Sequence, residues 1–206
     1  MCIRDSFKRF LYAIGILLFL FFYIDPYISQ LCSGLPRSYR YYLKTTSLIL
    51  SPPFHLLSWS LIYLFAKSRF KNSLFFFLSR QIFYSLTLSL SLVYCMKIVC
   101  GRARPELLLR EIYGFYFMMQ NHHYHSFPSG HASVAACLFF PLLSSFPKYR
   151  VYWIVLPILL SSSRVLLNYH FTSDIVASGM MCYMVHEIYR KYGDKKRKSD
   201  LFNPIS

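Results

Sequence analysis

The stretch Ser73–Met96, SLFFFLSRQIFYSLTLSLSLVYCM, decides the fold class of this chain. It holds a single charged residue, Arg80, within a run of apolar and hydroxyl side chains. A helix needs about 20 mainly apolar residues to cross the hydrocarbon core of a bilayer. The stretch meets that length, so we expect it to form a membrane-spanning helix.

Five further apolar segments lie before and after it. They are Phe10–Ile24, Ser47–Ala66, Ser129–Phe146, Val151–Leu167 and Phe171–Tyr189. The second and third of these also meet the spanning length, and the other three reach it with flanking Tyr, Ser or Lys residues. The sequence therefore predicts an all-α fold, an integral membrane six-helix bundle.

The composition agrees with a membrane protein of one domain, residues 1–206. The chain is 55% hydrophobic and only 15% charged, against about 25% charged residues in a soluble protein. Its formal charge is +15, but the basic residues mostly flank apolar runs, as in membrane proteins. We therefore expect the lipid bilayer, and no nucleic acid, as its partner. The first six residues, MCIRDS, are set aside, and whether they are native stays open.

The distribution of Lys and Arg predicts the orientation, because these residues are enriched in cytoplasmic segments. The segments that would lie inside with a cytoplasmic N-terminus hold more of them than the alternate segments, and they include the basic tail 190–206. We expect both termini inside and segment 97–128 outside, facing the periplasm if the membrane is a bacterial inner membrane.

Three polar clusters fall at the predicted outer ends of helices three to six. They are KIVCGRARP (Lys97–Pro105), PSGH (Pro128–His131) and SRVLLNYHFTSD (Ser163–Asp174). Although they are far apart in sequence, the predicted topology brings them to one membrane face. We expect the active site there.

In the third cluster, His170 and Asp174 have the i, i+4 spacing that places two side chains on one face of a helix. A carboxylate that binds one ring nitrogen leaves the other as a nucleophile or base. The alternative is a polar pair at a helix start, where a carboxylate is favourable in any case.

Three cations, Lys97, Arg104 and Arg164, accompany this pair. Arginine binds phosphate oxygens in a bidentate manner and lysine supplies a point charge, so together they predict an anion site. Pro105 indicates that the helix ends near Arg104. The alternative is that basic residues here are interfacial anchors that reach lipid headgroups, and that interpretation fits Arg102 and Arg110 better.

The second cluster has the residues of a helix start. Ser129 can cap the helix, Gly130 allows a ligand to approach the backbone, and the free N–H groups can bind an anion. His131 would stand in the first turn, where it could protonate a leaving oxygen. An ordinary helix cap remains the alternative.

In order, the clusters give K-x6-RP, PSGH and SR-x5-H-x3-D, a pattern that resembles the type 2 phosphatidic acid phosphatase superfamily of integral membrane lipid phosphatases. The residues that match its signatures are Lys97, Arg104, Pro105, Pro128, Ser129, Gly130, His131, Ser163, Arg164, His170 and Asp174. The core motifs thus span residues 97–174.

The resemblance implies a role for each residue. His170 would attack phosphorus and form a phosphohistidine, Asp174 would orient His170, and His131 would protonate the leaving group. Lys97, Arg104 and Arg164 would bind phosphate oxygens, helped by Ser129 and the backbone of Gly130. The substrate would be a membrane lipid that carries a phosphomonoester or a pyrophosphate.

No metal or other cofactor is expected. Mg²⁺ and Ca²⁺ prefer carboxylate ligands, and Asp174, one of the few outer acidic residues, is assigned to His170. A zinc site at His122, His123 and His125 is a weaker alternative because no Cys or carboxylate partner lies nearby in sequence. These histidines are expected in an outer loop.

Other functions stay open at this stage. A phosphotransferase of the same family, an anionic-lipid transporter and an inactive binding protein are the alternatives. The transporter is disfavoured because carrier sites lie near the membrane midplane. The substrate could be phosphatidate, phosphatidylglycerophosphate, a polyprenyl pyrophosphate or lipid A, and segment 106–127 is expected to set the choice. The organism and the oligomeric state are open.

Overall fold

The computed structural model describes residues 3–71 and 73–202. The first two residues of the opening stretch and the last four of the predicted basic tail lie outside the described residues. The elements of the described residues are all helices. Their extended segments contain one isolated β-bridge and no β-strand. This confirms the all-α prediction.

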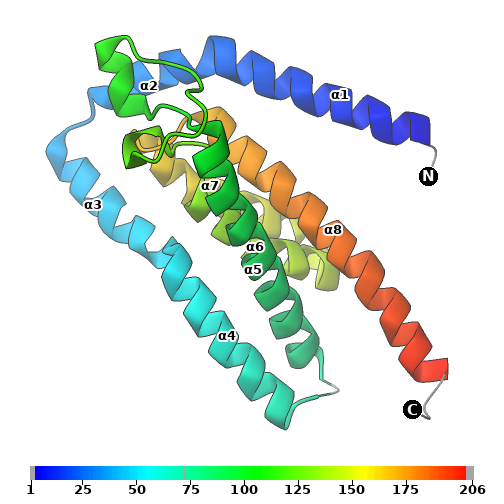
Figure 1. Cartoon of the computed structure of the whole chain (residues 1–206). Coiled ribbons are helices and arrows are strands. Elements are labelled where there is room, and N and C mark those ends of the chain that lie inside the picture. The colour runs from blue at the N-terminus through cyan, green and yellow to red at the C-terminus, as the bar shows by residue number, and fades with distance from the viewer. Residues whose placement is uncertain (1–2, 72, 203–206) are drawn as a thin grey trace. The chain divides into compact units, whose positions relative to one another are not determined.

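The α-helices carry the labels of Figure 1. They are α1 (Ile3–Phe19), α2 (Asp25–Ser33), α3 (Arg37–Ser47), α4 (Pro52–Arg69), α5 (Leu74–Cys100), α6 (Gly130–Ser145), α7 (Arg150–Leu166) and α8 (Thr172–Phe202). The short helical turns are η1 (Leu20–Ile24), η2 (Leu48–Leu50), η3 (Pro105–Arg110), η4 (His122–Tyr124) and η5 (Pro147–Tyr149).

The described residues form two compact units. Unit 1 takes its residues from 1–49, 93–129 and 161–178, and unit 2 takes its residues from 50–92, 130–160 and 179–206. Helices α5, α7 and α8 each contribute residues to both units.

In unit 1, the first apolar segment continues as helix beyond the predicted end at Ile24. The π-helical turn η1 passes directly into α2, whose second residue is Pro26. Proline has no N–H to donate and its ring displaces the carbonyl four residues earlier, which accounts for the wide turn before it. Asp25, Ser29 and Cys32 form the buried face of α2, and η3 packs against this helix (Figure 1).

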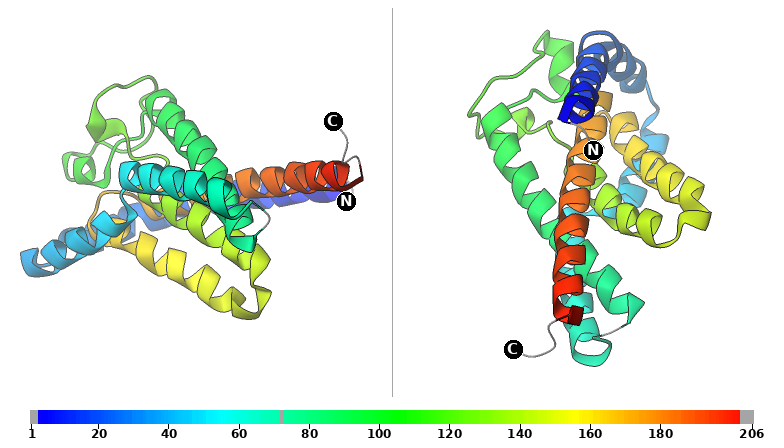
Figure 2. Two further views of the ribbon diagram at one scale, coloured as in Figure 1. Left: turned by 90° about the horizontal axis from the view of Figure 1, so that it is seen from below. Right: turned by 90° about the vertical axis from the view of Figure 1, so that its right-hand side faces the viewer.

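In unit 2, a small apolar core holds the helices together. Its buried residues are Leu50, Ile82, Leu86, Val134, Ala135, Ala136, Cys137 and Cys182. Small residues on α6 allow helix backbones to approach closely, which is typical of packing in membranes, and α4 packs on α6. Figure 2 shows α6 turning back through η5 into α7.

Three helical segments are long and apolar enough to cross a membrane: Phe10–Ser33, Ser38–Arg69 and Leu74–Cys100. Helix α6 is apolar but shorter. The predicted span Ser73–Met96 thus corresponds closely to α5. The count of six spans stays a prediction.

Candidate active site

The end of α5 is shaped by a glycine. Gly101 has φ +54°, and a Cβ built there would lie 3.0 Å from the carbonyl oxygen of Tyr116. The chain can therefore turn closely here, and an antiparallel bridge forms between Arg102 and Phe115. Arg104 follows in an extended conformation before Pro105. The helix therefore ends before Arg104, as predicted from the proline.

Three cations gather in unit 1. Lys97 is in the last turn of α5 and Arg164 is in the last turn of α7, and both interact electrostatically with Arg104. The ammonium of Lys97 donates to the carbonyl of His125 over 2.5 Å. Arg164 donates to Ser47 Oγ over 3.0 Å, and its guanidinium lies over the ring of Tyr169. The structure thus brings together the three basic residues that the motifs predicted.

This cluster leaves hydrogen-bond donors unused. Among the described residues, the Nε atoms of Arg104 and Arg164 are buried without a hydrogen-bond partner. Burial lowers the pKa of Arg104, because removal from water disfavours its charge. Buried donors normally find a partner, and a bound phosphate would supply oxygen acceptors as well as negative charge.

His170 lies beside this cluster and is 4% exposed. Its Nδ1 is 2.6 Å from the carbonyl oxygen of Ser126. A carbonyl only accepts, so Nδ1 carries the hydrogen and the neutral ring keeps its lone pair on Nε2. Burial lowers the pKa of His170 to about 4, and the charges of Lys97 and Arg104 act in the same direction. The ring is therefore neutral at pH 7 and can act as a nucleophile.

Asp174 is fully buried in the first turn of α8. Its Oδ2 accepts hydrogen bonds from Ser126 Oγ (2.6 Å) and from the backbone N–H of Phe171 (2.8 Å). The distance from Oδ2 to His170 Nδ1 is 3.7 Å. The predicted geometry was wrong in one respect. His170 precedes α8, which begins at Thr172, and its Nδ1 is hydrogen-bonded to a carbonyl, while the carboxylate of Asp174 makes the predicted i, i+4 contact at 3.7 Å.

The prediction for Arg102 as an interfacial anchor was also wrong. Its side chain is 1% exposed and forms ion pairs with Asp25 and Asp174. A buried guanidinium is stable only when it is paired, and both carboxylates serve this purpose. Sequence reasoning missed Asp25 as a site residue. The signal that could have found it is a carboxylate directly after an apolar segment and within the candidate span Phe10–Ser33, since ionisable residues inside a membrane are functional by default.

The second motif contains the point along the chain at which unit 1 passes into unit 2. Ser129, in unit 1, is fully buried, and its backbone N–H donates to Ser178 Oγ over 2.8 Å. Gly130 and His131 open α6 in unit 2. The chain places His131 two residues beyond Ser129, and its predicted role as a proton donor stays a prediction.

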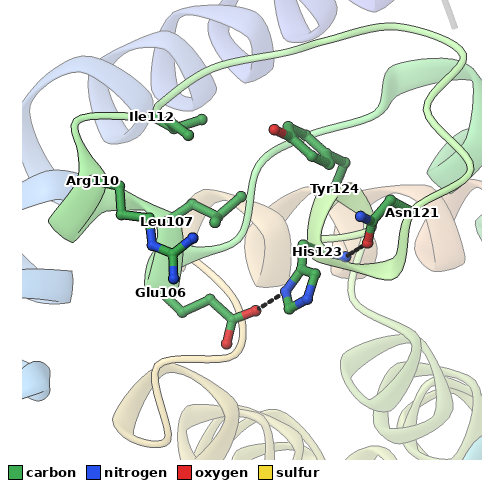
Figure 3. A pocket seen from close by; sticks show the side chains of 7 residues that line it. All are labelled: Glu106, Leu107, Arg110, Ile112, Asn121, His123 and Tyr124. Atoms are coloured by element: carbon green, nitrogen blue, oxygen red, sulfur yellow. Dashed lines mark hydrogen bonds and ion pairs between the residues drawn. The ribbon is translucent and has the colours of Figure 1, made fainter.

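The loop that carries His122, His123 and His125 lines a cavity of about 350 Å³ in unit 1 (Figure 3). Its lining residues are Glu106, Leu107, Arg110, Ile112, Asn121, His123 and Tyr124. His123 Nδ1 lies 2.6 Å from Glu106 Oε1, and His125 Nε2 lies 3.0 Å from the carbonyl of Met119. Among the residues the structure describes, no three His, Cys, Asp or Glu side chains are grouped so that they could hold a metal ion.

Comparisons with known proteins give a consistent result. A model described as the PAP2 superfamily matches residues 78–198, more than half of the chain. Lipid A 1-phosphatases of Rhizobium johnstonii and Rhizobium etli are each 35% identical over 99 residues, which is 47% of this chain. The match covers 40% and 42% of those relatives, so the chain spans about two fifths of their length.

A solved structure has the same fold. It is described as the crystal structure of the first transmembrane PAP2 type phosphatidylglycerolphosphate phosphatase from Bacillus subtilis. The TM-score is 0.56 at 18% identity, over 90% of this chain and 96% of that one. The likeness supports an integral membrane fold for this chain.

Proposed function

This chain belongs to the PAP2 superfamily, and from that premise we propose that it hydrolyses a phosphomonoester or pyrophosphate on a membrane lipid. The observation that carries the proposal is the group of Lys97, Arg104 and Arg164 with the neutral, buried His170 beside it. Phosphoryl transfer needs an aligned nucleophile and positive charge on the equatorial oxygens. These four side chains supply both.

The proposed reaction has two steps. His170 Nε2 attacks phosphorus, the bond from phosphorus to the lipid oxygen breaks, and His131 donates a proton to that oxygen. Water then attacks the phosphohistidine and gives a proton to His131, which restores its first state, while the P–N bond breaks and inorganic phosphate leaves. The three cations balance the charge of the phosphoryl oxygens throughout, so the proposed reaction needs no metal.

Residues beside the site are proposed to select the lipid headgroup. Glu106 follows Arg104 by two residues, and the backbone N–H of Arg104 donates to the carbonyl of His123 over 2.9 Å. The cavity of Figure 3 therefore adjoins the phosphate-binding cations, and it offers carboxylate, imidazole, amide and guanidinium groups to a polar headgroup. The relatives named above act, by their descriptions, on lipid A and on phosphatidylglycerolphosphate, so both belong among the substrates tested.

The experiment is phosphate release by the purified protein from a panel of four substrates. They are lipid A, phosphatidylglycerophosphate, phosphatidate and a polyprenyl pyrophosphate. We expect turnover in EDTA, inhibition by vanadate, which mimics five-coordinate phosphorus, and a loss of at least about 10³-fold in kcat for His170→Ala, by analogy with removal of other nucleophiles. Wild-type turnover by His170→Ala would exclude the proposed nucleophile, and dependence on added metal would exclude the metal-free reaction.

Two further outcomes refine the proposal. A phosphorylated acceptor lipid in place of free phosphate would identify a phosphotransferase. Glu106→Gln should alter the ratio of kcat/KM between two headgroups while turnover of the preferred substrate persists, with the exposed Glu111→Gln as the matched control. An unchanged ratio would exclude the cavity from headgroup selection.

A further inference from the structure

Arg102 is 1% exposed, and both of its terminal nitrogens donate hydrogen bonds. NH1 donates to Asp174 Oδ1 and to Ser173 Oγ, the latter over 2.7 Å. NH2 donates to Asp25 Oδ2 over 2.8 Å. Although it belongs to the same loop as Arg104, its fork is committed to two carboxylates. Its two terminal nitrogens therefore link two acidic side chains, while its Nε is buried without a hydrogen-bond partner among the described residues.

Aromatic rings hold this guanidinium in place. Its central carbon lies 4.5 Å from the ring centre of Phe171, 4.9 Å from that of Phe21 and 5.4 Å from that of Phe115. The rings exclude water and favour a cation over their faces. In this environment an ion pair is weakly screened, so loss of one partner strongly affects the others.

Asp25, the first residue of α2, is the second carboxylate that Arg102 binds. Its Oδ1 accepts from the backbone N–H of Ser173 over 3.0 Å, and its Oδ2 accepts from Ser173 Oγ and from Arg102. Ser29, one helical turn further along α2, donates to Asn168 over 2.9 Å. The buried face of α2 thus binds the chain between α7 and α8, which carries His170, through Ser29, and the first turn of α8 through Asp25. Asp25 lies outside residues 78–198, the part of the chain that the family model matches.

The pair of Asp25 and Arg102 is connected to His170 through two residues, Asp174 and Ser126. Arg102 holds Oδ1 of Asp174, which leaves Oδ2 directed at Ser126 Oγ and the Phe171 N–H. Ser126 in turn presents its carbonyl to His170 Nδ1. A change in the orientation of Asp174 would therefore displace the group that fixes the tautomer of His170.

We propose that Asp25 and Arg102 are positioning residues of the reaction, which act through Asp174 and Ser126 to hold His170 as a nucleophile. This inference rests on the proposed function of His170. It assigns the positioning role to the charge of Asp25 and not to the rest of α2.

The decisive variant is Asp25→Asn. Asparagine keeps the size of the side chain, but it removes the charge that Arg102 faces and one of the two acceptor oxygens. We expect kcat for a short-chain lipid phosphate to fall about 10–100-fold, the range seen when supporting residues of other sites are changed. KM should stay within about threefold, since the phosphate-binding cations are intact. Asp25→Glu, which keeps the charge, should recover most of the lost kcat.

Ser29→Ala is the matched control. It removes a hydrogen bond from the same face of α2 and leaves the charged network intact, so kcat should stay near the wild-type value. An equal loss of kcat in both variants, in proportion to a loss of thermal stability, would show that α2 acts only as a support and would overturn the proposal. Wild-type kcat in a folded Asp25→Asn protein would overturn it equally.

Two measures keep the inference testable in every case. If Asp25→Asn does not fold, Ser173→Ala removes the hydroxyl that binds both Asp25 and Arg102, and we expect a fall in kcat of about 10-fold; an unchanged kcat there contradicts the proposal. If the wild type releases no phosphate, the proposed function fails. The NMR resonances of the His170 ring then still test whether Asp25 and Arg102 position that ring. They should differ between wild type and Asp25→Asn, and identical resonances would exclude that role.

Discussion

At the scale of single residues, the tautomer of His170 is set by a backbone atom. The carbonyl of Ser126 cannot donate, so it selects the form with hydrogen on Nδ1. Asp174 stabilises this arrangement from 3.7 Å and through the hydroxyl of Ser126. The pair His170 and Asp174 was visible in the sequence because both are side chains at a recognisable spacing. The role of Ser126 could not be predicted from the sequence, because it acts on His170 through its backbone carbonyl, which every residue has.

The same environment predicts how His170 titrates. Burial lowers its pKa to about 4, against about 6.5 for an unperturbed histidine. The folded protein therefore keeps the ring neutral from pH 7 down to about 5. Its contribution to stability is complete above pH 6.5 and is lost as the pH falls from 6.5 towards 4, because the unfolded chain binds the proton first.

NMR of protein with labelled histidines, in micelles and without substrate, measures this directly. His170→Asn identifies the resonance. We expect a titration midpoint near pH 4, and a midpoint near 6.5 would show that the ring is hydrated.

At the scale of elements, hydropathy located α6 and α7 to within one residue at both ends, but it missed the ends of other helices. Ser73–Met96 was predicted and α5 is Leu74–Cys100. The second predicted span, Ser47–Ala66, corresponds to η2 and α4. Helix α2 was missed because Asp25 and Pro26 interrupt the apolar run, and the sequence offers no local reason for the helix to continue. Asp25 binds Arg102, 77 positions away, and no spacing rule reveals such a pair.

The junction between α5 and its loop depends on Gly101. Its positive φ disfavours any residue with a Cβ by about 1–2 kcal/mol, and the close carbonyl of Tyr116 adds to that cost. Gly101→Ala should therefore lower the thermal stability of the protein in detergent. It should also lower kcat/KM for the lipid phosphate, because Arg102 and Arg104 follow directly.

Gly179→Ala in α8 is the control. Nothing lies within 4 Å of a Cβ built there, and alanine is the better helix former. We expect its melting temperature to equal or exceed that of the wild type. Equal stability of the two variants would contradict the role of Gly101.

At the scale of the whole molecule, the exposed apolar surface requires a membrane. On α4, Phe54, Leu57 and Leu61 are 62%, 64% and 60% exposed, and they recur at the spacing of one helix face. Water would make such a surface prone to aggregate, whereas lipid covers it without cost. The lengths of the three candidate spans support this reasoning. The apolar surface does not determine the orientation of the chain in the membrane, which is predicted from the distribution of Lys and Arg.

The predicted orientation has a direct test. With both termini inside, the loop that carries Met118 lies on the extracytoplasmic side and the turn at Lys71 lies in the cytoplasm. Both side chains are exposed, so each can be replaced by cysteine in a variant that lacks the native cysteines. In intact spheroplasts, a membrane-impermeant maleimide should label Met118→Cys, and it should label Lys71→Cys only after permeabilisation. The reverse pattern would place the candidate site on the cytoplasmic face, and it would leave the chemistry proposed for His170 unchanged, because the contacts of His170 with Ser126 and Asp174 are the same in either orientation.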